Sequence, residues 1–119
     1  MGDRKPEGRD EFVRYYNAAI AIPHSEAVSR IESISRELGV FLVVGVIEKD
    51  FGTLYCTVIF VDPEHGFVAK HRKLVPTGME RIIWGQGDAS TLPIHEASFP
   101  SPKNEGKAVK ARLSATICW

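Results

Sequence analysis

The chain has 119 residues, of which 44% are hydrophobic and 25% are charged, a composition typical of one ordinary soluble domain. Its 15 Lys and Arg residues balance 15 Asp and Glu residues. This balance argues against binding to nucleic acid or to an anionic membrane surface, because both need a clustered excess of positive charge. The longest apolar stretch, 40–47, is far shorter than the roughly 20 residues that cross a bilayer, and the charged N-terminus lacks the apolar core of a secretory signal. We therefore expect a cytoplasmic protein without a transmembrane helix.

Two helices are predicted at the start of the chain. Apolar residues at three- and four-residue spacings predict a short amphipathic helix from Asp10 to about Ile20, which Pro23 ends. Ser25 is a suitable N-cap for a second helix, and Gly39 is a natural stop for it. The apolar stripe of this second helix consists of Val28, Ile31, Ile34 and Leu38.

The middle of the chain is predicted to be a β-meander. The run of β-branched and aromatic residues over 40–47 predicts a strand that is covered on both faces, as in the interior of a layered α/β protein. Turn residues at 49–52 and at 62–66 connect it to strands over 53–61 and 67–73.

The last third of the chain is predicted to be largely irregular. Residues 74–93 are rich in Gly, Pro, Thr and Ser and predict a long ordered loop with at most one short helix, and loops of this length usually carry function. Residues 98–110 have the composition of a flexible, exposed segment. The alternating pattern over 111–117 predicts a further strand.

Lys73 and Glu80 are the first candidate functional pair. On residue types alone, the more common interpretation is a basic strand end that pairs with nearby acids on a solvated surface. The functional alternative is a lysine that points into a cleft beside a carboxylate, where each group keeps the other charged and the lysine can stabilise a developing anion.

The two cysteines and four histidines are candidates for nucleophilic and metal chemistry. Cys118 follows a predicted strand, where α/β sheets often place nucleophiles, although a small buried side chain is the commoner role of a cysteine. Cys56 fits that structural role better than any chemical one. Without a secretory signal both thiols are expected to be reduced. None of His24, His65, His71 and His95 has a partner at zinc-ligand spacing, so no metal site is expected. A glycine-containing segment at 85–88 matches a phosphate-binding loop only weakly.

The second half of the chain contains an ordered series of motifs: His71-Arg-Lys-Leu-Val-Pro-Thr77, Glu80-Arg81, Trp84-Gly-Gln-Gly-Asp88, Ser90-Thr-Leu-Pro93 and Ala115-Thr-Ile-Cys-Trp119. The series extends upstream through residues 6–9 and 12, 42–48 and 53–57. Over nearly the whole chain these residues resemble the nitrilase branch of the carbon–nitrogen hydrolase superfamily.

The resemblance implies an αββα sandwich and a Glu-Lys-Cys triad that a second glutamate supports. It makes Lys73 the triad lysine, Glu80 the supporting glutamate and Cys118 the nucleophile. In the family, the thiolate attacks a nitrile carbon, a glutamate acts as general base and the lysine stabilises the tetrahedral species. Ammonia leaves, and water then hydrolyses the thioester to a carboxylic acid. The chemistry implies a small nitrile as substrate and no cofactor.

The same resemblance implies that residues 1–119 are a partial nitrilase domain, an α/β chain incomplete at both ends. The family's general base lies upstream of the stretch that begins at Pro6, and Glu48 matches a non-catalytic position. The family continues beyond Cys118, and 98–110 is longer than the usual connection. We therefore expect little or no nitrile hydrolysis by the chain alone.

Two further interpretations remain. The chain is either a non-catalytic module that associates with an intact nitrilase, since nitrilases commonly form homo-oligomers, or the product of a truncated or mis-spliced reading frame. The preferred nitrile, and acid rather than amide as the product, do not follow from the sequence.

Overall fold

The computed structural model describes residues 5–100 and 107–113. Two helices come first, α1 (Pro6–Ala18) and α2 (Glu26–Leu38). Helix α1 begins earlier than the apolar spacing predicted, because Pro6 occupies its first turn with a backbone angle already suited to a helix and Glu7 favours the helix dipole.

The limits of α2 are those that the sequence predicted. The Ser25 hydroxyl oxygen accepts a hydrogen bond from the backbone N–H of Val28 at 3.3 Å, which satisfies one of the unpaired donors of the first turn. Gly39 ends the helix in the left-handed region with a φ of 64°, a conformation that glycine adopts without steric cost.

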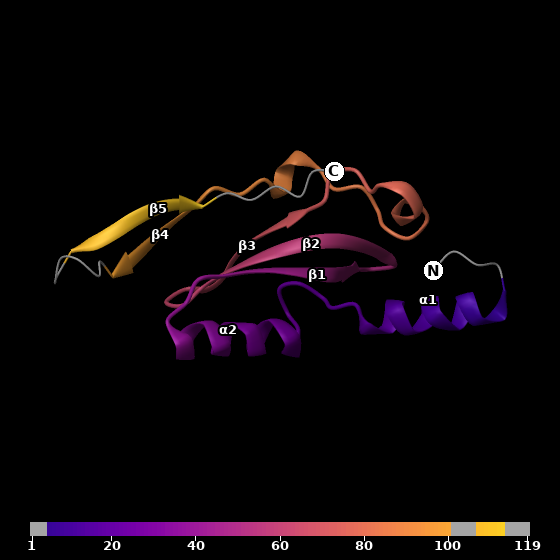
Figure 1. Cartoon of the computed structure of the whole chain (residues 1–119), viewed down its shortest axis with the longest axis horizontal. Coiled ribbons are helices and arrows are strands. Elements are labelled where there is room, and N and C mark those ends of the chain that lie inside the picture. The colour runs from indigo at the N-terminus through magenta and orange to yellow at the C-terminus, as the bar shows by residue number, and fades with distance from the viewer. Residues whose placement is uncertain (1–4, 101–106, 114–119) are drawn as a thin grey trace.

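A three-stranded antiparallel sheet follows, in the order β1 (Leu42–Asp50), β2 (Thr53–Asp62) and β3 (Gly66–Arg72). The predicted meander is thus confirmed. Helix α2 packs on one face of this sheet (Figure 1), where Val28 meets Ile59 and Val61 in a buried apolar cluster.

The prediction that the first strand is covered on both faces was wrong within the part of the chain that the structure describes. Val43 and Gly45 of β1 are exposed, and Val43 keeps 51% of its surface accessible. The apolar run reflects the β-branched preference of a strand whose second face is only partly covered by other described segments.

The segment after β3 turns back along the edge of the sheet beside β2 and β3 and contains two short 3₁₀ helices, η1 (Gly78–Ile82) and η2 (Ala89–Thr91). It leads to a hairpin of β4 (His95–Pro100) and β5 (Ala108–Leu113). Residues 98–100 and 108–110, at the two ends of the segment predicted to be a flexible insertion, belong to these strands, and residues 101–106 lie outside the described part. The strand predicted over 111–117 begins earlier than predicted, at Ala108. Residues 114–117 lie outside the described part.

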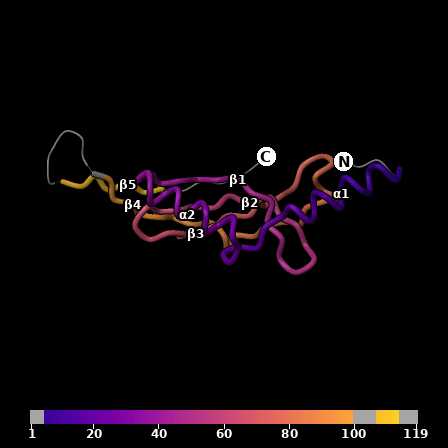
Figure 2. Tube along the Cα trace, turned by 90° about the horizontal axis from the view of Figure 1, so that it is seen from below, coloured from indigo at the N-terminus to yellow at the C-terminus, as the bar shows by residue number. Residues whose placement is uncertain are grey.

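The molecule is elongated, with principal extents of 61 × 26 × 23 Å. The hairpin lies at one end of the long axis and α1 at the other in both views (Figures 1 and 2). The ring of Phe41 stacks on His95 at 5.5 Å and so joins the hairpin to the sheet. Among the described helices none is long and apolar enough to cross a membrane.

Candidate functional site

Lys73 directly follows strand β3, at the point where β3 stops pairing with β2 and the segment around Gly85 pairs with β2 instead. Its backbone N–H still donates to the Cys56 carbonyl at 2.8 Å, as in a continued strand β3. The chain then turns away, and the backbone N–H of Gly85 donates to the next available carbonyl of β2, that of Leu54, at 2.8 Å. Gly87 in turn donates to the Lys73 carbonyl at 2.9 Å. The backbone N–H and the backbone carbonyl of Lys73 are therefore both hydrogen-bonded, which fixes the position from which its side chain extends.

The Lys73 ammonium forms an ion pair with Glu80 inside this turn. Lys73 Nζ lies 2.5 Å from Glu80 Oε2 and 3.2 Å from the Thr77 hydroxyl. Lys73 is only 5% exposed, whereas the Glu80 side chain is 34% exposed. A buried ammonium needs such partners, because an unpaired charge is costly to remove from water.

Glu80 is itself oriented by the turn that contains it. Oε2 of Glu80 accepts the backbone N–H of Thr77 at 2.8 Å and the Thr77 hydroxyl at 3.0 Å. The backbone N–H of Glu80 in turn donates to the Thr77 side chain, and this bond and the first form the capping box at the start of η1. The hydrogen bond from Lys73 and those from Thr77 lower the pKa of Glu80 to about 2. The carboxylate is therefore ionised at neutral pH and faces an ammonium group.

The structure brings together two of the three predicted catalytic residues, Lys73 and Glu80. The third, Cys118, lies outside the described residues. The thiol of Cys56 is free and partly buried. Burial raises its pKa, the charge of Lys73 opposes this rise and the charge of Glu80 adds to it. A thiol that burial keeps protonated suits the structural role predicted for Cys56.

The two glycines of the 85–88 segment allow close packing of the chain. A Cβ atom on Gly85 would lie 2.8 Å from the ring of Tyr55, and one on Gly87 would lie 2.5 Å from the carbonyl oxygen of Arg72. The segment lies directly against the sheet edge, which accounts for the glycines without a phosphate ligand.

Replacing Gly87 by alanine is expected to lower the free energy of unfolding by about 2–3 kcal/mol, because backbone atoms must move to admit the methyl group. Urea denaturation followed by circular dichroism measures the change. Gly52→Ala is the matched control, since nothing lies within 4 Å of the position that its methyl group would take, and a change below about 0.5 kcal/mol is expected there. Equal stability of the two variants would contradict the close approach.

A long-range hydrogen bond ties α1 to the site. The indole N–H of Trp84 donates to the Tyr15 hydroxyl at 2.8 Å, and the backbone N–H of Trp84 donates to the Glu80 carbonyl at 2.8 Å. Burial raises the pKa of the Tyr15 phenol. Helix α1 therefore contacts the residue that follows the Glu80 turn.

A second, separate charge cluster surrounds Glu48, which is 1% exposed. Its carboxylate accepts hydrogen bonds from Thr57 at 2.8 Å, from Lys70 at 2.5 Å and from Arg72 at 2.6 and 2.9 Å. Burial would raise the pKa of Glu48, but the hydrogen bonds from Arg72, Lys70 and Thr57 outweigh it and hold the pKa at about 2. The guanidinium of Arg72 also stacks 3.8 Å above the Tyr55 ring. Because Thr57, Lys70 and Arg72 all donate to this buried carboxylate, we interpret the cluster as one that stabilises the sheet.

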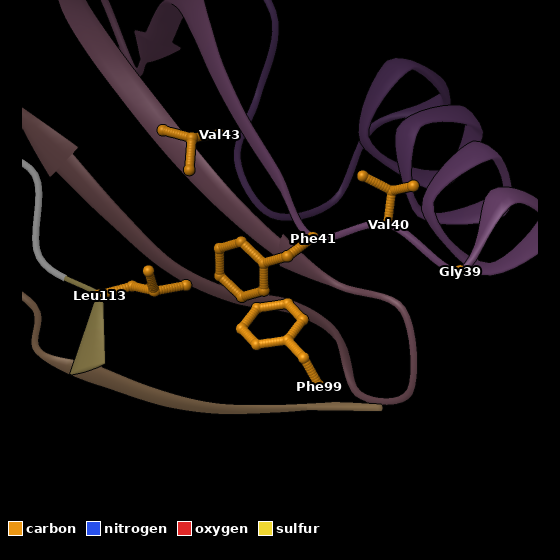
Figure 3. A pocket seen from close by; sticks show the side chains of 6 residues that line it. All are labelled: Gly39, Val40, Phe41, Val43, Phe99 and Leu113. Atoms are coloured by element: carbon orange, nitrogen blue, oxygen red, sulfur yellow. The ribbon is translucent and has the colours of Figure 1, made fainter. Parts of the chain in front are cut away.

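An apolar hollow of about 370 Å³ lies away from both charged clusters, between the start of β1 and the hairpin. Figure 3 shows the rings of Phe41 and Phe99 against each other, with Val43 and Leu113 beside them. Within the described ranges 5–100 and 107–113, no group of His, Cys, Asp and Glu side chains is arranged to hold a metal ion.

Sequence reasoning from residue types did not identify the role of Thr77. The signal was present, because Thr77-Gly-Met-Glu80 has the Ser/Thr-x-x-Glu spacing of a capping box. The Trp84–Tyr15 bond joins residues 69 positions apart, so local spacing gives no sign of it.

Comparison with known proteins gives one family match and many relatives. Residues 8–119 match the carbon-nitrogen hydrolase family. The chain is 69% identical over 119 residues to an arylacetonitrilase of Trametes versicolor (strain FP-101664) and 45% identical to nitrilase 1 of Arabidopsis thaliana. All of this chain aligns in both cases, covering 37% and 31% of those proteins. The chain thus spans about a third of the length of these relatives.

The fold also matches solved structures. A crystal structure of an N-terminal amidase superposes with a TM-score of 0.68, at 19% identity, over 86% of this chain and 26% of that chain. At this identity the likeness concerns the fold alone.

Proposed function

Because the chain belongs to the nitrilase branch of the carbon–nitrogen hydrolase family, we propose that it supplies the lysine, the supporting glutamate and the nucleophile of a nitrile-hydrolysing active site. Lys73 is the triad lysine, Glu80 supports it and Cys118 is the nucleophile. The proposed substrate class is arylacetonitriles, by analogy with the 69% identical arylacetonitrilase.

The observation that carries this proposal is the buried Lys73 ammonium, 5% exposed and paired with Glu80 at 2.5 Å. A fixed, partly desolvated cation stabilises negative charge that develops on a substrate nitrogen more strongly than a hydrated surface lysine does. Glu80 keeps its charge and holds the ammonium in place, which suits a supporting role.

In the proposed reaction the Cys118 thiolate forms a C–S bond to the nitrile carbon, and the nitrile nitrogen takes up a proton to give a thioimidate. Addition of water and release of ammonia leave a thioester. A second water breaks the C–S bond, which releases the carboxylic acid and restores the thiol. The role proposed for the Lys73 ammonium is to stabilise the negative charge that develops on the nitrogen and oxygen atoms in these steps.

The test is a chimera in which these 119 residues replace the matching part of the Trametes versicolor arylacetonitrilase. We expect the chimera to release ammonia from an arylacetonitrile, and Cys118→Ala to abolish the release while Cys56→Ala retains it. A folded chimera that is inactive, or one that remains active with Cys118→Ala, would contradict the proposal.

A second candidate function is association with an intact nitrilase. The apolar hollow beside Phe41 and the 51% exposure of Val43 favour it, because contiguous exposed apolar surface often marks a protein interface. Size-exclusion chromatography of the chain mixed with the intact arylacetonitrilase tests this function. Co-elution that Val43→Asp abolishes is expected, and separate elution of two folded proteins would rule it out.

A further inference from the structure

His71 is a fully buried histidine that the proposed reaction does not use. It lies in β3 opposite Val58 of β2, and its exposed fraction is 0%. Burying an imidazole in place of an apolar side chain is unfavourable unless its polar atoms find partners. The partners that His71 has therefore indicate its role.

One ring nitrogen of His71 has a partner and the other has none among the described residues. Nδ1 lies 2.7 Å from the carbonyl oxygen of Thr91, while Nε2 is buried without a hydrogen bond. A carbonyl oxygen only accepts, so Nδ1 must carry the hydrogen. In the neutral ring Nε2 is then a bare acceptor, since a proton there would create a buried, unpaired donor.

Thr91 is the last residue of a segment that touches both members of the candidate pair, and we name residues 84–91 the strap. At its start, the backbone N–H of Trp84 donates to the Glu80 carbonyl at 2.8 Å. At its middle, Gly87 donates to the Lys73 carbonyl at 2.9 Å.

At its end the strap is fixed to β3 through Thr91. The Thr91 carbonyl accepts from His71, and the Thr91 hydroxyl accepts from the backbone N–H of Arg72 at 3.1 Å. The strap is thus anchored to consecutive residues of β3, immediately before Lys73.

We propose that His71, through its Nδ1–H donor, is a positioning residue that fixes the strap and through it the Lys73–Glu80 pair. The effect of His71 on catalysis rests on the proposed function. Its effect on the position of the pair can be measured without turnover, because the strap makes a backbone hydrogen bond to both Lys73 and Glu80. Loss of the Nδ1–H donor would leave Thr91 held to β3 only by the Arg72 bond, and we expect this weaker anchoring to allow the Lys73–Glu80 distance to increase.

Two substitutions distinguish a His71 that acts by donating a hydrogen bond from Nδ1 from a His71 that only fills space in the core. Asparagine places its amide N–H near the position of Nδ1–H, whereas glutamine places its amide near Nε2. His71→Asn should therefore keep the bond to Thr91, and His71→Gln should lose it.

The readout is the Glu80 carboxyl titration in the full chain, followed by ¹³C NMR, with urea denaturation recorded in parallel. The pKa of Glu80, about 2 in the native chain, should stay there in His71→Asn and rise toward the ordinary value of about 4.3 in His71→Gln. A Glu80 pKa that stays near 2 in His71→Gln, or that rises equally in both variants, would show that the imidazole is only structural and would overturn the proposal.

Two measurements do not depend on the folding of His71→Gln. The ¹⁵N shifts of the native imidazole at neutral pH should identify Nδ1 as protonated and Nε2 as bare, and the opposite tautomer would overturn the proposal. Thr91→Val removes the strap's bond to Arg72 and should also raise the pKa of Glu80, and an unchanged pKa would count against it. None of these readouts needs turnover, so failure of the proposed function would appear separately, in the ammonia assay of the chimera.

Discussion

Replacing Lys73 by methionine in the chimeric arylacetonitrilase is expected to lower kcat for nitrile hydrolysis by about 100- to 1000-fold, the loss typical of removing one preorganised donor to a developing anion. Methionine keeps much of the length of the lysine side chain and removes only its charge and its donors. Lys73 is 5% exposed and its ammonium is held by Glu80 and Thr77, so the substitution removes a charge that the fold keeps in one position.

The matched control for this prediction is Lys110→Met. Lys110 is exposed on β5 and should leave kcat within about twofold, because an isolated surface charge contributes little. Steady-state ammonia release over a range of arylacetonitrile concentrations separates kcat from KM. If Lys73→Met changed only KM, the lysine would bind substrate without stabilising the transition state.

Replacing Glu48 by alanine is expected to reduce the free energy of unfolding of the chain by about 3–5 kcal/mol. Removing one partner of a buried ion pair leaves the other charge without its counter-ion. Here Lys70 and Arg72 would lose their shared carboxylate, and Arg72 would keep only its bond to Asp50 at 2.7 Å. Their side chains are only 25% and 17% exposed. Urea denaturation at neutral pH measures the difference.

The control for Glu48→Ala is Glu96→Ala, which breaks the pair with Arg112 on the hairpin. The side chains of Arg112 and Glu96 are 78% and 59% exposed, and loss of their pair should cost less than about 1 kcal/mol. Equal effects of the two substitutions would show that the Glu48 cluster contributes no more than a surface pair.

The stability contributed by Glu48 should also depend on pH. Its pKa in the folded chain is about 2, below the ordinary value of about 4.3 in an unfolded chain. The contribution is therefore complete above about pH 4.3 and is lost as the pH falls toward 2. Glu48→Ala should lack this part of the acid sensitivity, so the stability difference between the two proteins should shrink below about pH 4.

Local signals in the sequence predicted much of the fold. Ser25 and Gly39 limit α2 as predicted, since caps depend on the chemistry of single residues. The meander was likewise predictable from apolar runs and turn residues. Coverage of β1 was not, because it depends on which segments pack against Val43 and not on the strand itself.

The candidate pair was predictable in part. Lys73 and Glu80 are seven positions apart and meet across one turn, so a local interpretation already placed them together. The bonds of His71 to Thr91 and of Trp84 to Tyr15 span 20 and 69 positions. Such contacts follow from the path of the whole chain, which no local pattern specifies.

The most direct test of the assigned nucleophile is peptide mass spectrometry of the chimera after rapid acid quenching during turnover of an arylacetonitrile. We predict that the arylacetyl group is attached to the peptide that contains Cys118, and that the peptide that contains Cys56 is unmodified. Attachment at Cys56, or undiminished turnover by a Cys118→Ala chimera without any acylated cysteine, would contradict the account.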